Sequence, residues 1–453
     1  MTKAVLKTKS LSLQASTSSF DFQKVPLLSV YFVQGALGLS RLATSYFFKD
    51  ELHLSPAEMA AIGGIISIPW IIKPLYGFVS DGLPIFGYKR KSYLFFSGLV
   101  GALSWLALGT IVTDSTGAII ANVLGSASIA VSDVVVDSIV VEKSRPETEA
   151  IANDTSVLST AGDLQSLCWG ASAVGGIASA YYSGSLLETL STRQVFQLTA
   201  LFPLMISITS FFLDEKRDSS STSLAVLSGN IQNQLTQLKN TLQNPNIYLP
   251  VLFIFMWQAT PTADSAMFFY SSNELHFQPE FLGRIRLAAN IASLIGIVLF
   301  RTKLKNYSSK SIILWTTLLS SLIGLTPVLL VTHYNRVLGL PDQLFSLADT
   351  VVLTVLGQIA FMPTLVLAST LCPPGIEGTL FASLMSIYNL AGVMSNELGA
   401  GLTSLLGVNE LNYDNLVLLL VICSLSSLLP LTFLNLLDYA KPVTVAEAKD
   451  HIV

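Results

Sequence analysis

Two acidic residues lie close together in an otherwise apolar stretch, "SDVVVDSIVVEK". Asp133 and Asp137 are four residues apart, so both side chains lie on one face of a helix. Counted back from Lys143 at 1.5 Å per residue, Asp137 lies ~9 Å and Asp133 ~15 Å along that helix. If the helix crosses a membrane, each carboxylate costs at least ~2.5 kcal/mol unless it is protonated, paired or in contact with water. The two acids therefore indicate a proton relay or substrate anchor, or else a structural ion pair.

Two basic residues lie at comparable depths in other apolar stretches. Lys73, in "IIKPLYGFVSD", lies ~12 Å from the end of its stretch and is the candidate partner of Asp133 in the structural alternative. Arg41 lies ~22 Å from the start of its stretch, where an unpaired guanidinium is expensive. Its planar fork suits a carboxylate of a substrate. The alternatives for Arg41 are pairing with Asp163 or extension toward the membrane interface.

An indole and an amide are further binding candidates. Trp257 and Asn290 both fall near the middle of apolar stretches, where they offer an aromatic face and an amide to a flat heterocycle. Packing between helices is the alternative for both residues. Arg284 and Arg286 lie near one end of the stretch that contains Asn290, where they either attract anions or anchor the helix at the membrane interface.

The rest of the sequence offers little other chemistry. The four His have no metal-ligand spacing, no phosphate-binding Gly-rich loop is present, and the three Cys are isolated in apolar surroundings. Asp264 and Asp349 fall near the ends of their stretches, where contact with water explains them. We therefore expect no catalytic residue, no metal site, no cofactor and no nucleic-acid partner.

The elements that position these residues are predicted to be membrane helices. Of the 453 residues, 51% are hydrophobic and only 12% are charged, whereas soluble domains contain about 25% charged residues. Apolar runs of about 20 residues, the length that crosses a ~30 Å hydrocarbon core, recur about twelve times. The runs are predicted to begin near Pro26, Pro56, Ser92, Thr116, Glu147, Gln194, Ile247, Pro279, Ser311, Gln343, Ile376 and Tyr413. The predicted fold class is an all-α protein embedded in the lipid bilayer.

The distribution of Lys and Arg predicts orientation and organisation. Positive charges favour cytoplasmic loops, and with the N-terminus inside, the outer segments contain only Lys49, Arg193 and Arg336. The longest polar stretch divides the runs into two equal sets, which predicts two pseudo-symmetric six-helix halves. The predicted segments are a cytoplasmic tail (1–25), a first half (26–213), a cytoplasmic linker (214–246), a second half (247–437) and a cytoplasmic tail (438–453). For the first segment, an organellar transit peptide is the alternative.

The loop between the second and third runs contains a short motif. In "GFVSDGLPIFGYKRK", Gly77 and Asp81 precede a basic run that contains Lys89 and Arg90. This order resembles the G-x-x-x-D-R-x-G-R-R signature of the major facilitator superfamily, whose two halves rock about a central site. The chain departs from the signature in having Gly82 where a basic residue is usual and "LPIF" in the spacer. The resemblance implies that Asp81 and Arg90 hold the halves together when the cytoplasmic gate is closed.

Four stretches carry a closer resemblance: "KPLYGFVSDGLPIFGYKRKSYL", "SDVVVDSIVVEKSR", "LQSLCWGASA" and "YDNLVLLLVICSLSSLLPL". Together they resemble the folate-biopterin transporter family, in particular its photosynthetic branch, over about residues 27–437. One departure is "IANDTSVLSTAGD" (151–163), which is longer than expected before "LQSLCWG".

The resemblance implies a secondary transporter of folates, pterins or related small molecules. It would work by alternating access, with the proton as the candidate coupling ion. The implied location is the plasma membrane, or alternatively the chloroplast envelope. Two other functions stay open, a major facilitator transporter of a different small organic anion and a membrane sensor that has lost transport.

The predicted orientation is testable by labelling. In a cysteine-free background, single cysteines at Ser219 in the linker and at Ser272 near a predicted outer loop should react with a membrane-impermeant reagent from opposite sides of the membrane. Labelling of both positions from the same side would contradict the orientation.

Overall fold

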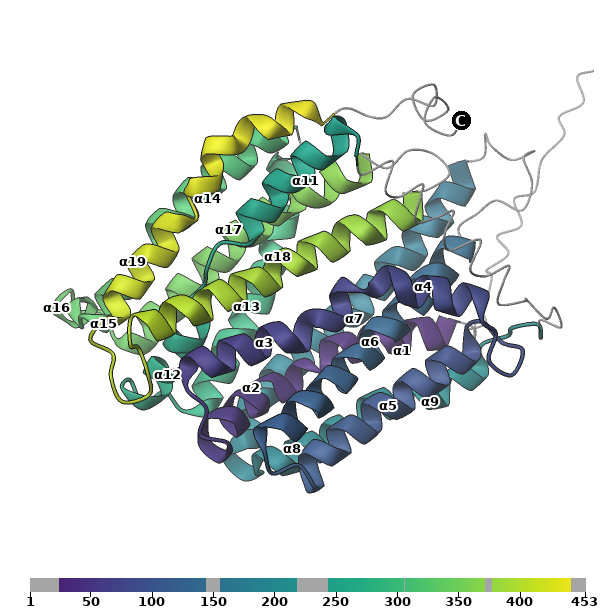
Figure 1. The fold of residues 1–453 in the computed structure, drawn as a ribbon, viewed down its shortest axis with the longest axis horizontal. Coiled ribbons are helices and arrows are strands. Elements are labelled where there is room, and N and C mark those ends of the chain that lie inside the picture. Colours follow the sequence, from purple (N-terminus) through teal and green to yellow (C-terminus); the bar gives the residue numbers. More distant parts are fainter. Residues whose placement is uncertain (1–23, 144–154, 218–242, 305, 371–376, 441–453) are drawn as a thin grey trace, which may run out of the picture.

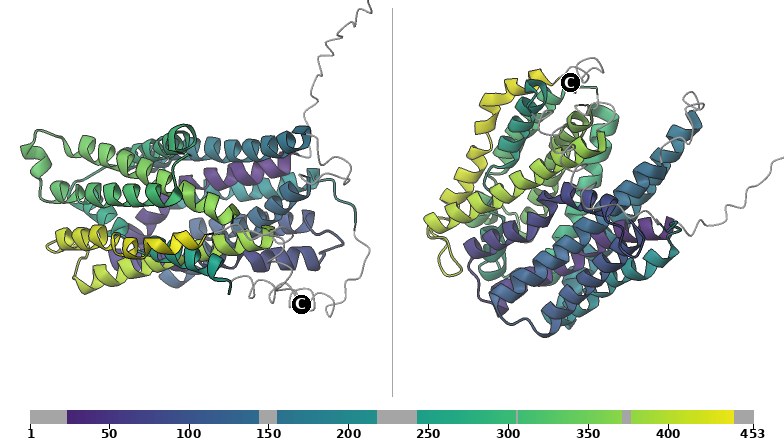
Figure 2. Two further views of the ribbon diagram at one scale, coloured as in Figure 1. Left: turned by 90° about the horizontal axis from the view of Figure 1, so that it is seen from above. Right: turned by 45° about the vertical axis from the view of Figure 1, so that its right-hand side comes forward.

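The computed structural model describes residues 24–143, 155–217, 243–304, 306–370 and 377–440. Within these residues regular structure is helical, and β pairing is limited to an isolated bridge between Ile85 and Tyr88. Figure 1 shows long helices that lie side by side with their axes roughly aligned, the N-terminal ones in purple and blue and the C-terminal ones in green and yellow. The two sets form two bundles, as Figure 2 shows from other directions.

The first bundle is built from helices of the N-terminal half. It contains α1 (Lys24–Ala36), α2 (Gly38–Tyr46), η1 (Phe47–Glu51), α3 (Pro56–Ile71), α4 (Lys73–Gly82), α5 (Lys91–Thr110), α6 (Ser115–Lys143), α7 (Thr155–Thr189), α8 (Thr192–Thr199), α9 (Leu201–Thr209) and η3 (Ser210–Phe212). Two hydrophobic clusters fill this bundle, one around Val30 and Val136 and the other around Phe47 and Phe196. Both clusters draw their residues from the first bundle, so this half has its own core.

The second bundle is built from helices of the C-terminal half. It contains α11 (Pro245–Gln258), α12 (Asp264–Asn273), α13 (Pro279–Leu299), η4 (Phe300–Leu304), α14 (Ser309–Ile323), α15 (Pro327–Val331), α16 (Tyr334–Val337), α17 (Asp342–Thr370), α18 (Glu377–Leu405), α19 (Leu416–Ser426) and η5 (Leu429–Tyr439). Its clusters surround Phe253 with Ile313, and Tyr270 with Leu416. The second half therefore also has its own core.

The helix lengths and surface suit a lipid environment. Nine stretches of the described residues are long and apolar enough to cross a membrane. Large apolar side chains such as Leu103, Trp315 and Leu322 are more than half exposed, as expected where lipid replaces water as the surrounding solvent. The chain is therefore a multi-pass integral membrane protein, and the number of twelve crossings stays a prediction.

The predicted helix starts agree with the structure to within three residues wherever both are described. Two of them, Pro56 of α3 and Pro279 of α13, are the first residues of their helices. Proline suits this position because its missing N–H would have no partner in the first turn. The predicted starts at Glu147 and Ile376 lie outside the described residues.

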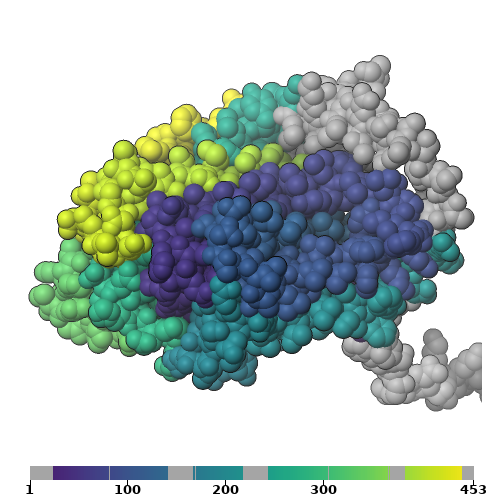
Figure 3. Space-filling view, turned by 60° about the horizontal axis from the view of Figure 1, so that its bottom comes forward, coloured from purple at the N-terminus to yellow at the C-terminus, as the bar shows by residue number. Residues whose placement is uncertain are grey.

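The two bundles meet along two pairs of helices. α3 packs along α18, and α7 packs along α13; Figure 3 shows the purple and blue surface of the first bundle directly against the yellow-green surface of the second. At the crossing of α7 and α13, a Cβ atom at Gly283 would lie 2.7 Å from the backbone nitrogen of Gly184. Small residues let membrane helices approach this closely, so Gly184 and Gly283 set the spacing of the bundles there.

The end of the molecule away from Leu213 and Pro245, here called the distal end, is closed where α12 packs against α3 of the first bundle. The rings of Tyr46 and Phe268 pack edge to face across the boundary with centroids 5.5 Å apart. Phe268 belongs to α12, which is separated from α11 by a non-helical break at Thr260–Ala263. Ser395 of α18 donates a hydrogen bond to the Thr260 carbonyl at 2.5 Å, which satisfies a backbone group freed by the break.

The contact of α1 with α7 gives a stability prediction. A Cβ atom at Gly175 would collide with Phe32 O and lie 2.9 Å from Ala36 N, whereas one at Gly170, on the same helix, would have no atom within 4 Å. We expect Gly175→Ala to destabilise the protein by about 1–3 kcal/mol through overpacking. Gly170→Ala should be neutral or slightly stabilising because alanine favours helix. Thermal unfolding in detergent measures both, and equal melting temperatures would contradict this account of the contact.

Candidate functional site

The interior of the first bundle holds an ion pair between two of the predicted residues. The ammonium group of Lys73 on α4 contacts the carboxylate of Asp133 on α6. Lys73 is the first residue of α4, directly after the break at Ile72, and it also lies 5.0 Å from the centre of the Trp70 ring. From α1, the Gln34 side-chain amide donates to the other Asp133 oxygen at 2.6 Å. Asp133 is only 7% exposed, so three helices meet at one buried carboxylate.

Asp137 lies one turn further along α6 and has different surroundings. The Tyr31 hydroxyl donates a hydrogen bond to its carboxylate at 2.6 Å. Unlike Asp133, the Asp137 side chain is exposed, although it is close enough to interact electrostatically with both Asp133 and Lys73. Asp137 is therefore the carboxylate of the cluster that solvent can reach.

The cluster of Lys73, Asp133 and Asp137 is not electrically balanced. Two carboxylates share one ammonium group, and among the described residues no second cation pairs with either acid. When all three groups are ionised, the cluster carries one net negative charge. Uncompensated charge inside a membrane protein is costly, so the cluster favours one added proton or a positively charged group.

The sequence located these three residues but missed two of their partners. The Lys73–Asp133 pair, offered from the sequence as the structural alternative, is present, and the relay role stays a prediction. Tyr31 and Gln34 were missed. Their signal was available, because polar groups three residues apart inside an apolar run lie on one helix face.

Arg41 occupies the boundary between the bundles. It lies on α2, which packs against α7 and α13, and its side chain is exposed. Arg286 of α13 is near enough to Arg41 for the two guanidinium groups to repel each other. The side chain of Asp163, the alternative partner, lies outside the described part of the structure. The neighbouring Arg284 instead contacts Glu280, one turn away on the same helix.

The motif loop is held by an acid that the sequence did not single out. Backbone N–H groups of Lys89, Arg90 and Lys91 donate to the Glu215 carboxylate at 2.7, 3.0 and 2.8 Å. A carboxylate at the start of α5 is favoured by the positive end of the helix dipole. This contact fixes the loop to the end of its own bundle.

The other motif residues lie close by. The buried Arg90 guanidinium donates to the Ser80 hydroxyl at 3.3 Å, and Gly77 faces Val134 of α6, where a Cβ atom would make ordinary contact at 3.5 Å. Asp81 lies in the last turn of α4, and its side chain is outside the described part of the structure. The gate role of these residues stays a prediction.

The two candidates for binding a heterocycle already have partners. The Trp257 indole N–H donates to Thr317 Oγ1 at 2.9 Å, within the second bundle. The Asn290 amide donates to the Gly176 carbonyl at 3.0 Å and so links α13 to α7. Trp257 therefore packs inside one bundle, whereas Asn290 lies at the boundary between them.

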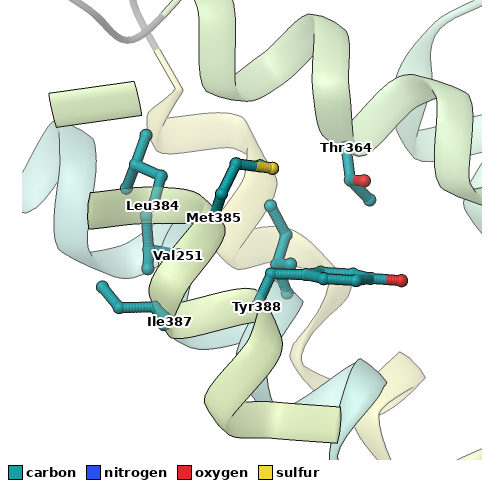
Figure 4. Close-up of a pocket in the computed structure, with 7 residues that line it drawn as sticks. Val251, Thr364, Leu384, Met385, Ile387 and Tyr388 are labelled. Atoms are coloured by element: carbon teal, nitrogen blue, oxygen red, sulfur yellow. The ribbon is translucent and has the colours of Figure 1, made fainter. Parts of the chain in front are cut away.

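A small cavity lies between α11, α17 and α18. Its volume is about 20 Å³, room for about one water molecule. Figure 4 shows Met385 and Tyr388 of α18 on one side and Thr364 of α17 on the other. This cavity is too small for an organic substrate.

A much larger cavity lies within the second bundle, behind α12. It measures about 550 Å³, within the range of small-molecule sites. Asp264 and Asp349, expected from the sequence simply to contact water, both line it. The Thr326 hydroxyl donates to Asp349, and among the described residues neither acid pairs with a basic side chain. The lining suits a ligand that offers N–H groups to carboxylates.

Several relatives of the chain are named as folate or folate-biopterin transporters. It is 51% identical over 422 residues to the "Folate-biopterin transporter" of Synechocystis sp., covering 93% of this chain and 83% of the relative. It is 32% identical over 437 residues to "Folate transporter 2" of Plasmodium falciparum, covering 96% and 92%. A "Probable folate-biopterin transporter 2" of Arabidopsis thaliana is 32% identical over 417 residues, covering 90% and 81%.

Solved structures with low identity share the fold. The nucleoside transporter NupG aligns with a TM-score of 0.68 at 14% identity and covers 92% of this chain and 100% of its own. A D-xylose–proton symporter aligns with a TM-score of 0.64 at 13% identity, covering 94% and 99%. These likenesses show the major facilitator fold. The family model of the BT1 family matches residues 34–453, and the chain therefore belongs to the BT1 family of folate-biopterin transporters.

Proposed function

We propose that the protein is a secondary transporter that moves folates, pterins or related compounds across a membrane without changing them chemically. The names of its relatives support the substrate class, and the fold supports alternating access between two bundles. The close approach of the bundles at Gly184 and Gly283 and the closed distal end fit one of the two end states of such a cycle.

The proposed mechanism couples transport to protons through the cluster of Lys73, Asp133 and Asp137. The observation that carries this proposal is the shared ammonium group, which leaves one carboxylate charge unbalanced. A proton that binds the cluster cancels this charge, so the loaded transporter can close around a neutral interior. Release of the proton to the other side restores the charge. Asp137 is the proposed proton acceptor, because solvent reaches it whereas Asp133 is held by Lys73 and Gln34.

The proposal includes the orientation and the membrane. We propose that both termini and the linker 214–246 face the cytoplasm, since the inner segments are rich in Lys and Arg. The proposed membrane is the plasma membrane, with the chloroplast envelope as the alternative. The halves 26–213 and 247–437 are the proposed moving units.

The coupling role is testable with purified protein in liposomes. We expect Asp137→Asn to abolish accumulation of radiolabelled folate driven by an imposed pH gradient. Exchange of labelled for unlabelled folate should persist, because exchange needs no net proton transfer. Asp414→Asn, in an exposed loop, is the matched control and should behave as the wild type. Normal accumulation by the Asp137→Asn protein would exclude this residue as the coupling group.

Breaking the ion pair between Lys73 and Asp133 should reduce the stability of the protein, whereas the Asp137 substitution should affect coupling. Lys73→Met leaves Asp133 buried without its cation, at a cost of roughly 3–5 kcal/mol. We therefore expect a marked loss of folded protein, measured by thermal unfolding and by yield from membranes. The double variant Lys73→Met with Asp133→Leu removes both charges and should recover stability. Equal stability of the single variant and the wild type would show that the pair is not structurally important.

A different small organic anion is the alternative substrate. Uptake that folate and pterins fail to inhibit would favour it, and binding without any uptake would favour a sensor.

A further inference from the structure

The boundary between the bundles holds two arginines for which the described residues provide no acid partner. Arg41 comes from α2 of the first bundle and Arg286 from α13 of the second, and their guanidinium groups are close enough to repel each other. Among the described residues, neither side chain has an ion-pair partner. Three other arginines contrast with them, since Arg193 contacts Glu51, Arg284 contacts Glu280 and Arg336 contacts Asp342.

The backbone geometry independently places both arginines on facing surfaces. Arg286 lies four residues before Asn290, so the two side chains share one face of α13. Asn290 on that face reaches the Gly176 carbonyl of α7 in the first bundle. α2, which carries Arg41, packs against both α7 and α13. The pair thus belongs to the surface where the bundles meet.

Two like charges in this setting require a counter-ion. Repulsion between them is stronger inside a protein than in water, and an unpaired guanidinium within the membrane is costly. Arg41 is exposed and Arg286 is partly exposed, so both belong to surface that a ligand could contact. A carboxylate fits best, since guanidinium forks bind its two oxygens through parallel hydrogen bonds.

We propose that Arg41 and Arg286 form a site for the carboxylate groups of the substrate, one arginine from each bundle. This inference rests on the proposed function and specifies the part of the substrate that is recognised. Folates carry carboxylates on their glutamate tail, whereas pterins such as biopterin carry none. The site therefore separates the two substrate classes, because it strengthens binding of folates and is not used by pterins.

Binding to purified full-length protein in detergent tests the proposal with two partial ligands. p-Aminobenzoylglutamate carries the tail without the pterin, and biopterin carries the ring without the tail. We expect Arg41→Gln and Arg286→Gln each to weaken competition by the tail fragment against radiolabelled folate by roughly 10- to 100-fold, the loss expected for a charged hydrogen-bonded contact. Competition by biopterin should be unchanged.

Control variants separate recognition from folding. Arg284→Gln, on the same helix but paired with Glu280, should bind both fragments as the wild type does. Arg41→Lys keeps the charge but loses the fork, so it should recover part of the affinity for the tail fragment. Direct binding of the tail fragment, measured as a rise in melting temperature, should be seen for the wild type and lost in both Gln variants.

The possible results are distinguishable. If the wild type binds neither folate nor biopterin, the proposed function fails. If it binds folate but the tail fragment neither competes nor raises the melting temperature, the carboxylate site is wrong while the function stands. Equal weakening of both fragments in the Gln variants would also overturn the site, since a loss of general structure and not of carboxylate recognition would explain it.

Discussion

The buried contact between Lys73 and Asp133 constrains the whole first bundle. An unpaired charge cannot be left inside a membrane protein without a large cost, so α4 and α6 must hold these two groups together, and Gln34 brings α1 to the same carboxylate. The break at Ile72 allows this, because it begins a new helix with Lys73 at its first position. Asp137 then lies one turn away, and the described residues provide no second cation for it. The proposed proton coupling uses this unbalanced charge.

Charge is distributed differently at the boundary of the bundles. In the cluster of Lys73, Asp133 and Asp137, acids outnumber bases by one. Between the bundles, Arg41 and Arg286 are two bases without an acid partner in the described structure. The two places together carry one net positive charge, so no exchange of residues between them would make both neutral. An anionic substrate would neutralise positive charge between the bundles, and a proton would neutralise the negative charge of the cluster.

Sequence patterns predicted the fold well because the bilayer imposes a length and a polarity on every crossing. Pro56 and Pro279 marked helix starts correctly, and Asp133 with Lys73 was identified as an intramembrane pair. Contacts between residues far apart in the chain were harder to predict from the sequence. Glu215 binds three consecutive N–H groups of the motif loop, yet it lies about 125 residues away in a polar stretch where an acid is unremarkable by composition. The cavity lined by Asp264 and Asp349 was missed for a similar reason, since helix ends are ordinarily wet and the break before α12 was not anticipated.

The first membrane crossing, formed by α1 and α2, connects the cluster of Lys73, Asp133 and Asp137 to the arginines at the boundary. Gln34 and Tyr31 of α1 bind the acids of the cluster, and Arg41 of α2 lies two turns beyond Gln34, ~10 Å along the same crossing. Leu37, between these groups, keeps helical dihedral angles and donates a backbone hydrogen bond to the Val33 carbonyl at 2.9 Å, so α1 and α2 form one nearly continuous helix. On the two proposals, an anion bound between Arg41 and Arg286 would draw α2 toward α13, and this helix would carry the displacement to Gln34 and Tyr31 beside the carboxylates. Substrate and proton can therefore influence each other through one helix, without any contact between the two ligands.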